Sequence, residues 1–139
     1  MKAAPLKLVV LFYIGICSAF TDGTPATNAL RGPAGIIAGE SLLTARAKLL
    51  EHDWKPTRIH ATDHYEYSGV ERELAMHHLF EVDTCSFDSS RCILFYSRKG
   101  ACLRVDTIGE RLNDMTVTHW ADMCPGAPAS GKGGTQQPR

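Results

Sequence analysis

The sequence predicts an α+β domain in which one or two short helices pack on a three- to four-stranded antiparallel sheet held by two disulfides. In the first half of the folded region apolar residues recur at helical spacing, and in the second half they alternate with polar residues. A length of 139 residues leaves room for one domain. Fifteen basic residues balance fifteen acidic ones, so we expect no nucleic-acid-binding surface.

The first 19 residues are typical of a secretory signal peptide. Two lysines precede a ten-residue apolar run, Leu8–Cys17, which is too short to span a bilayer. Small residues favour a cut after Ala19, while a cut after Ala29 and lipid attachment at Cys17 remain alternatives. We therefore expect a periplasmic or secreted protein whose mature chain has no transmembrane segment.

Removal of residues 1–19 changes two counts. It removes two of the fifteen basic residues and no acidic one, which leaves 13 basic and 15 acidic residues. It also removes one of the five cysteines. The four that remain in an exported chain predict two disulfides. The segment 20–40 is rich in glycine and proline and predicts a flexible arm, and 125–139 predicts a disordered tail. The folded domain is expected over residues 41–124.

The predicted helices come before the strands. Ser41 is a suitable N-cap for a helix over 42–52. Its apolar face is expected to comprise Leu43, Ala47, Leu50 and Trp54. The polar segment 57–68 has no period and predicts a loop or an edge strand, and a second, shorter helix is predicted over 70–78.

Four segments with strand patterns follow, at 80–84, 93–96, 101–106 and 115–120. In an antiparallel pair the apolar faces of the two strands must match. Placing Phe95 opposite Leu103 achieves this and leaves Arg98-Lys99-Gly100 as a three-residue loop, in which the glycine takes the left-handed position. A two-residue turn would place Phe95 opposite Arg104 and mix the faces, so we predict the three-residue loop.

This register also constrains the disulfides. It separates Cys92 from Cys102 by most of the hairpin, which is too far for a bond. Cys124 leaves the sheet on the side to which Cys102 points, which favours Cys102–Cys124 together with Cys85–Cys92. Cys85–Cys102 with Cys92–Cys124 remains the alternative. From loop entropy, the favoured bonds contribute about 2.5 kcal/mol for the shorter loop and about 3.4 kcal/mol for the longer one.

Short motifs along the chain form a familiar series: His52-Asp53-Trp54-Lys55-Pro56, the Cys85 and Cys92 pair with its apolar strand, Gly100-Ala-Cys-Leu, Val105-Asp-Thr, Gly109, and Trp120 to Cys124-Pro125. Over about residues 42–125 the sequence resembles a group of small exported proteobacterial proteins with cysteine-bracketed short strands. Asp53 stands where that group has glycine. The motifs are structural and the group has no assigned activity, so the resemblance implies no site residues.

The sheet face that points away from the helices is the predicted binding surface. Tyrosine, tryptophan and arginine are enriched at interaction hot spots. With the predicted register this face carries Leu94 and Thr116 and a candidate binding face formed by Tyr96, Arg104, Asp106, Thr118 and Trp120. The alternative is structural: Tyr96 and Trp120 pack over a Cys102–Cys124 bond, or the arm 20–40 covers them.

Together these features predict a non-catalytic binding module for a protein or an envelope component, with inhibition of a secreted enzyme as a special case. No serine lies in a Gly-x-Ser-x-Gly motif and the cysteines are expected to be bonded, so we expect no enzyme, metal or cofactor. One alternative is a structural envelope component. Another is a weak metal-dependent hydrolase that uses His60, Asp63 and His64, which have ligand spacing but lie in a segment that does not predict a helix.

Overall fold

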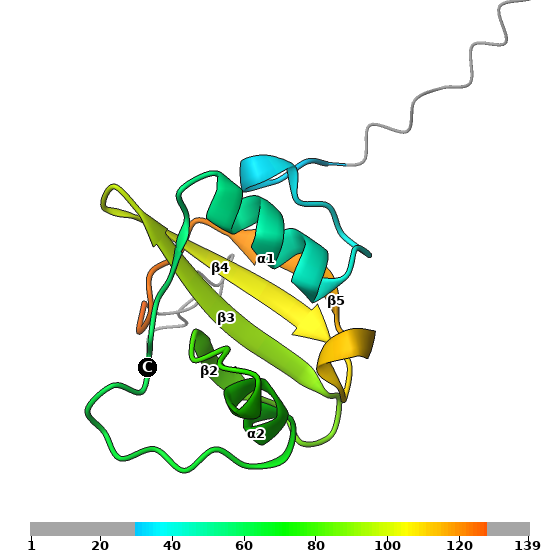
Figure 1. Cartoon of the computed structure of the whole chain (residues 1–139), viewed down its shortest axis with the longest axis vertical. Coiled ribbons are helices and arrows are strands. Elements are labelled where there is room, and N and C mark those ends of the chain that lie inside the picture. Colours follow the sequence, from blue (N-terminus) through cyan, green and yellow to red (C-terminus); the bar gives the residue numbers. More distant parts are fainter. Residues whose placement is uncertain (1–29, 128–139) are drawn as a thin grey trace, which may run out of the picture.

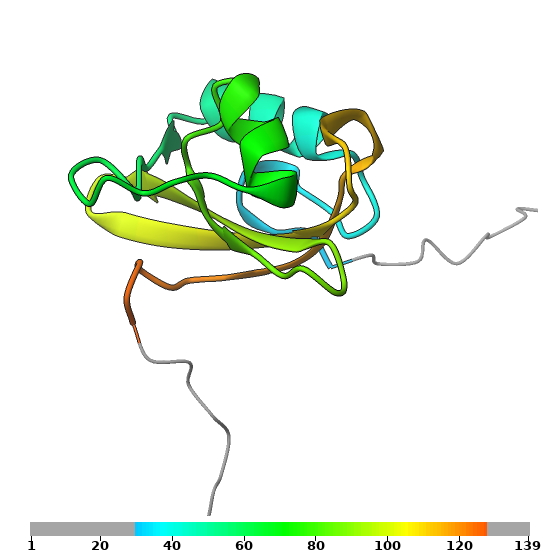
Figure 2. The ribbon, with the colours of Figure 1, turned by 90° about the horizontal axis from the view of Figure 1, so that it is seen from below.

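Two layers, one of helices and one of sheet, make up residues 30–127, the part of the chain that this computed structural model describes. The helix layer contains α1 (Leu42–Glu51) and α2 (Gly69–Met76), with the short 3-10 turns η1 (Pro33–Gly35) and η2 (Leu112–Asp114). The sheet contains β1 (Lys55–Pro56), β2 (Val82–Cys85), β3 (Arg91–Arg98), β4 (Ala101–Ile108) and β5 (Thr116–Ala121). Both helices lie on one face of the sheet (Figures 1 and 2), which confirms the predicted α+β class.

The sheet is antiparallel, with the order β1-β3-β4-β5, and β2 pairs with β3 on the edge that β1 also uses. The four predicted strands are present. The two-residue β1 is an additional edge strand that opposes Ser97 and Tyr96 of β3. We call the sheet face opposite the helices the open face.

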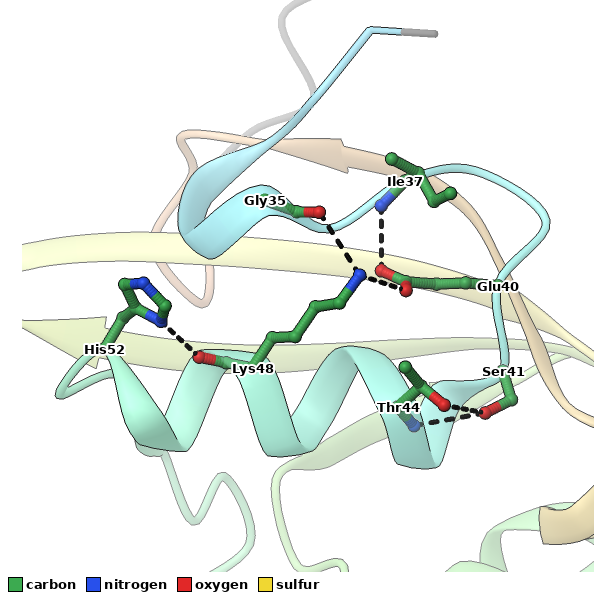
Figure 3. Close-up of polar contacts among 7 residues, drawn as sticks. All are labelled: Gly35, Ile37, Glu40, Ser41, Thr44, Lys48 and His52. Carbon is green, nitrogen blue, oxygen red and sulfur yellow. Dashed lines mark hydrogen bonds and ion pairs between the residues drawn. The ribbon is translucent and has the colours of Figure 1, made fainter.

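Helix α1 begins where its N-cap predicts. The Ser41 hydroxyl accepts a hydrogen bond from the Thr44 backbone N–H at 3.1 Å (Figure 3). The predicted apolar face is wrong for the three residues within the helix, because Leu43, Ala47 and Leu50 are exposed, whereas the predicted Trp54, after the helix, is buried. The helical residues that are buried are Leu42, Ala45 and Leu49. Two leucine pairs, at 42–43 and 49–50, offer two faces with equally good helical spacing, and contacts with the rest of the core select between them.

The segment before α1 is packed rather than flexible over residues 30–40. Ile36 is fully buried in the core, and the Glu40 carbonyl accepts from the Val117 N–H. The Glu40 carboxylate, which precedes α1, pairs at 2.6 Å with the ammonium of Lys48 in the last turn of α1 (Figure 3). Glycine and proline form turns here instead of a linker. The flexible-arm prediction is therefore wrong for residues 30–40.

Several predictions concern segments outside the described residues. These are the signal peptide 1–19, the arm residues 20–29 and the tail residues 128–139.

The β3–β4 hairpin closes with two residues, not three. Arg98 opposes Ala101, and the intervening Lys99 and Gly100 both have positive φ, at 49° and 81°. Two positive φ angles are the signature of a type I′ turn, whose twist matches that of the flanking strands. The predicted three-residue loop is wrong, and every pair in the hairpin differs by one position from the predicted register.

This one-residue shift sets the faces of the central strands. Tyr96 opposes Leu103, and both are fully buried under the helices. Phe95 opposes Arg104 on the open face, which is the mixed pairing that the predicted register avoids. The core beneath the helices is completed by Ile36, Leu42, Leu49, Leu74, Leu94, Val105, Met115 and Val117.

The disulfides are Cys85–Cys92 and Cys102–Cys124, as predicted, with Cα–Cα distances of 4.1 and 4.9 Å. Cys85 and Cys92 oppose each other on β2 and β3 and close the loop of residues 86–91. The Cys102–Cys124 bond ties the segment after β5 to β4. Residues 122–127 lie on the side of the sheet opposite the helices (Figure 2).

Candidate binding site on the open sheet face

The structure divides the predicted binding face between the two faces of the sheet. Tyr96 lies in the core, where its hydroxyl donates to the Glu81 carboxylate at 3.2 Å. Arg46 Nε donates to the same carboxylate oxygen at 2.6 Å. Burial raises the pKa of Tyr96 well above its usual value, and the negative charge of Glu81 raises it further. The placement of Tyr96 on the binding face is therefore wrong.

Trp120 also lies on the helix side. A β-bulge places Thr118 between the pairs Thr107–Val117 and Asp106–His119, so that Trp120 opposes the buried Val105. The extra residue reverses the alternation on which the prediction depended. The indole packs against the core close to Gly32, where a β-carbon would lie 2.5 Å from the ring. Only glycine leaves room for Trp120 at this position.

Arg104 and Asp106 remain on the open face and form an ion pair. Arg104 Nε donates to Asp106 Oδ1 at 2.6 Å, and Nη2 donates to Oδ2 at 3.2 Å. A third side-chain nitrogen, Nη1, lies 3.8 Å from the Met123 sulfur. The Thr118 hydroxyl donates to the Asp106 carbonyl at 3.1 Å. Three of the five predicted residues are therefore neighbours.

A pocket of about 360 Å³ opens beside this ion pair, and we call it the open-face pocket. Its volume is near the lower end of the range of small-molecule sites, about 300–1,000 Å³. Ile93 supplies apolar surface, and the buried Cys85–Cys92 disulfide links the two strands behind the pocket. The full lining is Thr84, Cys85, Ser86, Ser89, Arg91, Cys92, Ile93, Arg104, Asp106 and Thr107.

The disulfide-closed loop 86–91 forms one wall of the pocket. The Ser86 and Ser89 hydroxyls are 2.6 Å apart, and the Ser86 N–H donates to the Arg91 carbonyl at 2.8 Å. Phe87, between the two serines, is 90% exposed. The serines and Asp88 of this loop predict a turn, and that prediction does not include Phe87. The available signal was an aromatic residue in a cysteine-bounded loop too short to bury it.

The β2 wall of the pocket is supported from the helix side by Glu71 of α2. Its Oε1 accepts from the Cys85 N–H at 2.9 Å, and its Oε2 accepts from the Tyr65 hydroxyl at 2.9 Å. Burial, followed by the contact with Glu71, raises the pKa of Tyr65 to about 12. This buried carboxylate therefore joins the 57–68 loop, α2 and β2 next to the pocket.

The histidines considered for metal binding are arranged differently from a metal site. His60 Nδ1 lies 2.7 Å from Asp63 Oδ2, and Nε2 lies 2.6 Å from the Asp83 carbonyl. The ring also stacks on Tyr65 with centroids 3.6 Å apart. Both ring nitrogens of His60 are therefore engaged. Within residues 30–127 no three histidine, cysteine or acidic residues are grouped so that they could hold a metal ion.

The contacts of His60 favour its charged form. A carbonyl can only accept, so Nε2 donates to Asp83, and a second proton lets Nδ1 donate to Asp63. Burial lowers the pKa of His60, but the hydrogen bonds to Asp63 and Asp83 outweigh burial and raise it overall. His60 thus fastens the 57–68 loop to β2 through contacts that favour its protonated form.

Comparisons of this chain with protein-family models, with curated proteins and with solved structures found no match. No helix within residues 30–127 has the length and apolar character needed to cross a membrane.

Proposed function

We propose that the protein is a small exported, non-catalytic binding module that docks a protein or an envelope component on its open sheet face. The observation that carries this proposal is the open-face pocket, which is lined by an arginine–aspartate pair and walled by the loop 86–91, the loop that also carries the 90% exposed Phe87. Arginine and aromatic side chains beside a pocket are the usual anchors of protein interfaces.

The rigidity of this surface supports the proposal. Cys85–Cys92 closes the loop that presents Phe87, and Cys102–Cys124 holds the Met123 segment against Arg104. A surface that is ordered before binding loses little conformational entropy in the complex. A small module can therefore bind with few contacts.

The disulfides also support export. Cys85, Cys92, Cys102 and Cys124 are all paired, and such bonds persist in oxidising compartments such as the periplasm or the cell exterior. Together with the segment 1–19, this leads us to propose a periplasmic or secreted protein related to the small exported proteobacterial group that the sequence resembles. The intact mass of the exported protein tests this. It should equal residues 20–139 less four hydrogens, with no thiol available to a blocking reagent.

Substitution of the proposed surface tests docking. Phe87→Ser and Arg104→Ala should each reduce capture of a partner from the exported fraction at least tenfold, with an unchanged near-ultraviolet spectrum. Met76→Ser is the matched control, because Met76 is a 69% exposed apolar residue of α2 on the other side of the sheet. Equal capture by all four proteins would contradict the proposal. The absence of any soluble partner would favour a structural envelope component instead.

A further inference from the structure

The polar groups around the open-face pocket are paired with one another except at a single residue. The pairs are Ser86 with Ser89, Thr84 with Glu71, Thr107 with the Cys92 carbonyl, and Asp106 with Arg104. Arg91 is the exception. Arg91 is exposed and lines the pocket, and its guanidinium makes no hydrogen bond or ion pair with any residue in the described part of the chain.

The unpaired cation lies next to apolar surface. Arg91 and Ile93 are two residues apart on β3, so their side chains leave the strand on the same face. Ile93 opposes Asp106, which is paired with Arg104. A group placed over Ile93 would therefore have a guanidinium on each side.

The free N–H donors at the pocket belong to its two arginines. All five N–H groups of Arg91 are unused, and Arg104 keeps two N–H groups beyond its bonds to Asp106 and Met123. Among the lining residues within the described part of the chain, Asp106 has the only carboxylate, and it already accepts on both oxygens. Asp88, in the neighbouring loop, is exposed and does not line the pocket. The lining thus carries a formal charge of +1.

From this arrangement we infer that the open-face pocket binds a small carboxylate that carries an apolar side chain, the chemistry of a peptide's C-terminal residue. The carboxylate satisfies the guanidinium of Arg91, and the apolar side chain covers Ile93. The inference rests on the proposed function and specifies the ligand class of that same surface. A volume of about 360 Å³ suits one residue of this kind.

Two matched probes, N-acetyl-leucine and N-acetyl-leucinamide, test the carboxylate. Each is titrated into the mature, oxidised full chain while the Ile93 methyl and Arg91 Nε–H resonances are followed by NMR. N-acetyl-leucine should produce saturable shifts with a dissociation constant of about 1–10 mM, as expected for a ligand of this size. The amide should bind at least tenfold more weakly, because it has no negative charge.

Arg91→Gln should reduce the affinity for N-acetyl-leucine to that for the amide. Arg111→Gln, a change at an exposed arginine outside the pocket, should leave the preference unchanged. The thermal midpoints of both variants verify folding.

The outcomes separate this inference from the docking proposal. No saturable shift with either probe, equal affinity for both, or a preference that survives Arg91→Gln would overturn the carboxylate inference. Partner capture that still depends on Phe87 would keep the docking proposal. If the probes bind as expected but Phe87→Ser and Arg104→Ala leave partner capture unchanged, the carboxylate inference is supported and the docking proposal is contradicted.

Discussion

The two faces of the sheet each carry an arginine–carboxylate pair with a shortest N–O distance of 2.6 Å, but the two pairs have different surroundings. On the helix side, the Glu81 side chain is 1% exposed and also accepts from Tyr96. On the open face, the side chains of Arg104 and Asp106 are 25% and 23% exposed. Equal N–O distances therefore do not imply equal contributions to the free energy of unfolding. A buried charge that loses its partner has no water to solvate it, whereas a partly exposed one does.

What holds each face together differs in the same way. The helix side is stabilised by a continuous apolar core around Glu81. Within residues 30–127 no helix covers the open face, and its cover is the segment 122–127, which the Cys102–Cys124 bond attaches. The helix side is therefore stabilised by burial of apolar side chains, and the cover of the open face is held by a disulfide. This leaves the open face with room for a ligand.

Removal of the Cys102–Cys124 bond should have the largest effect on stability. Cys102→Ser/Cys124→Ser opens the loop that the bond closes in the unfolded chain, which raises the entropy of that state and should lower the free energy of unfolding by about 3.4 kcal/mol. It should also loosen the cover of the open face, so the Phe95 amide should exchange with solvent faster. Urea unfolding and hydrogen exchange measure these effects. A loss below about 1 kcal/mol would show that the open face does not depend on its covalent link.

Arg46→Met should have the next largest effect. It leaves the Glu81 carboxylate buried without a cation, which costs about 3–5 kcal/mol when a pair is fully buried. We expect about 3 kcal/mol, because the Arg46 side chain is itself 26% exposed and water can reach it. The double variant Arg46→Met/Glu81→Met should recover most of the loss in urea unfolding. A single variant as stable as the natural protein would show that burial does not distinguish the two pairs.

The His60 contacts predict a smaller, pH-dependent effect. Because folding raises the pKa of His60, the stabilisation is fully present below the unfolded value of about 6.5 and is lost as pH rises through the folded pKa. His60→Gln should therefore destabilise more at pH 5.5 than at pH 9, by about 1 kcal/mol, the usual net worth of one hydrogen bond.

His64→Gln is the control for this pH dependence, because His64 is exposed. Its unfolding free energy should follow the natural protein at both pH values. An equal effect of His60→Gln at pH 5.5 and pH 9 would contradict the assignment of an imidazolium at this position.

The sequence was sufficient for the fold class, for the start of α1 and for the disulfides. The disulfide prediction held in spite of the wrong register, because a one-residue shift still leaves Cys92 and Cys102 far apart along the hairpin. What failed was the assignment of residues to faces. The run Ile93–Tyr96 has no alternation, so it fits either register equally well.

The site could be predicted only in part for the same reason. The positive φ of Lys99 and the β-bulge at Thr118 both depend on tertiary packing. Neither lysine nor threonine is a residue type that predicts such a feature. Arg104 and Asp106 were found together because they are two apart on one strand, whatever its register. Tyr96 and Trp120 were misplaced because their faces depend on the turn and the bulge.

The smallest effect on stability should come from the open-face pair, where the comparison is tested most directly. Arg104→Met leaves Asp106 partly exposed to water, so the free energy of unfolding should fall by no more than about 1 kcal/mol. A double-mutant cycle with Asp106→Asn should give a coupling of similar size in urea unfolding. A coupling above about 2 kcal/mol would mean that this pair is structural like Arg46–Glu81. A small coupling together with impaired partner capture would place its role in binding.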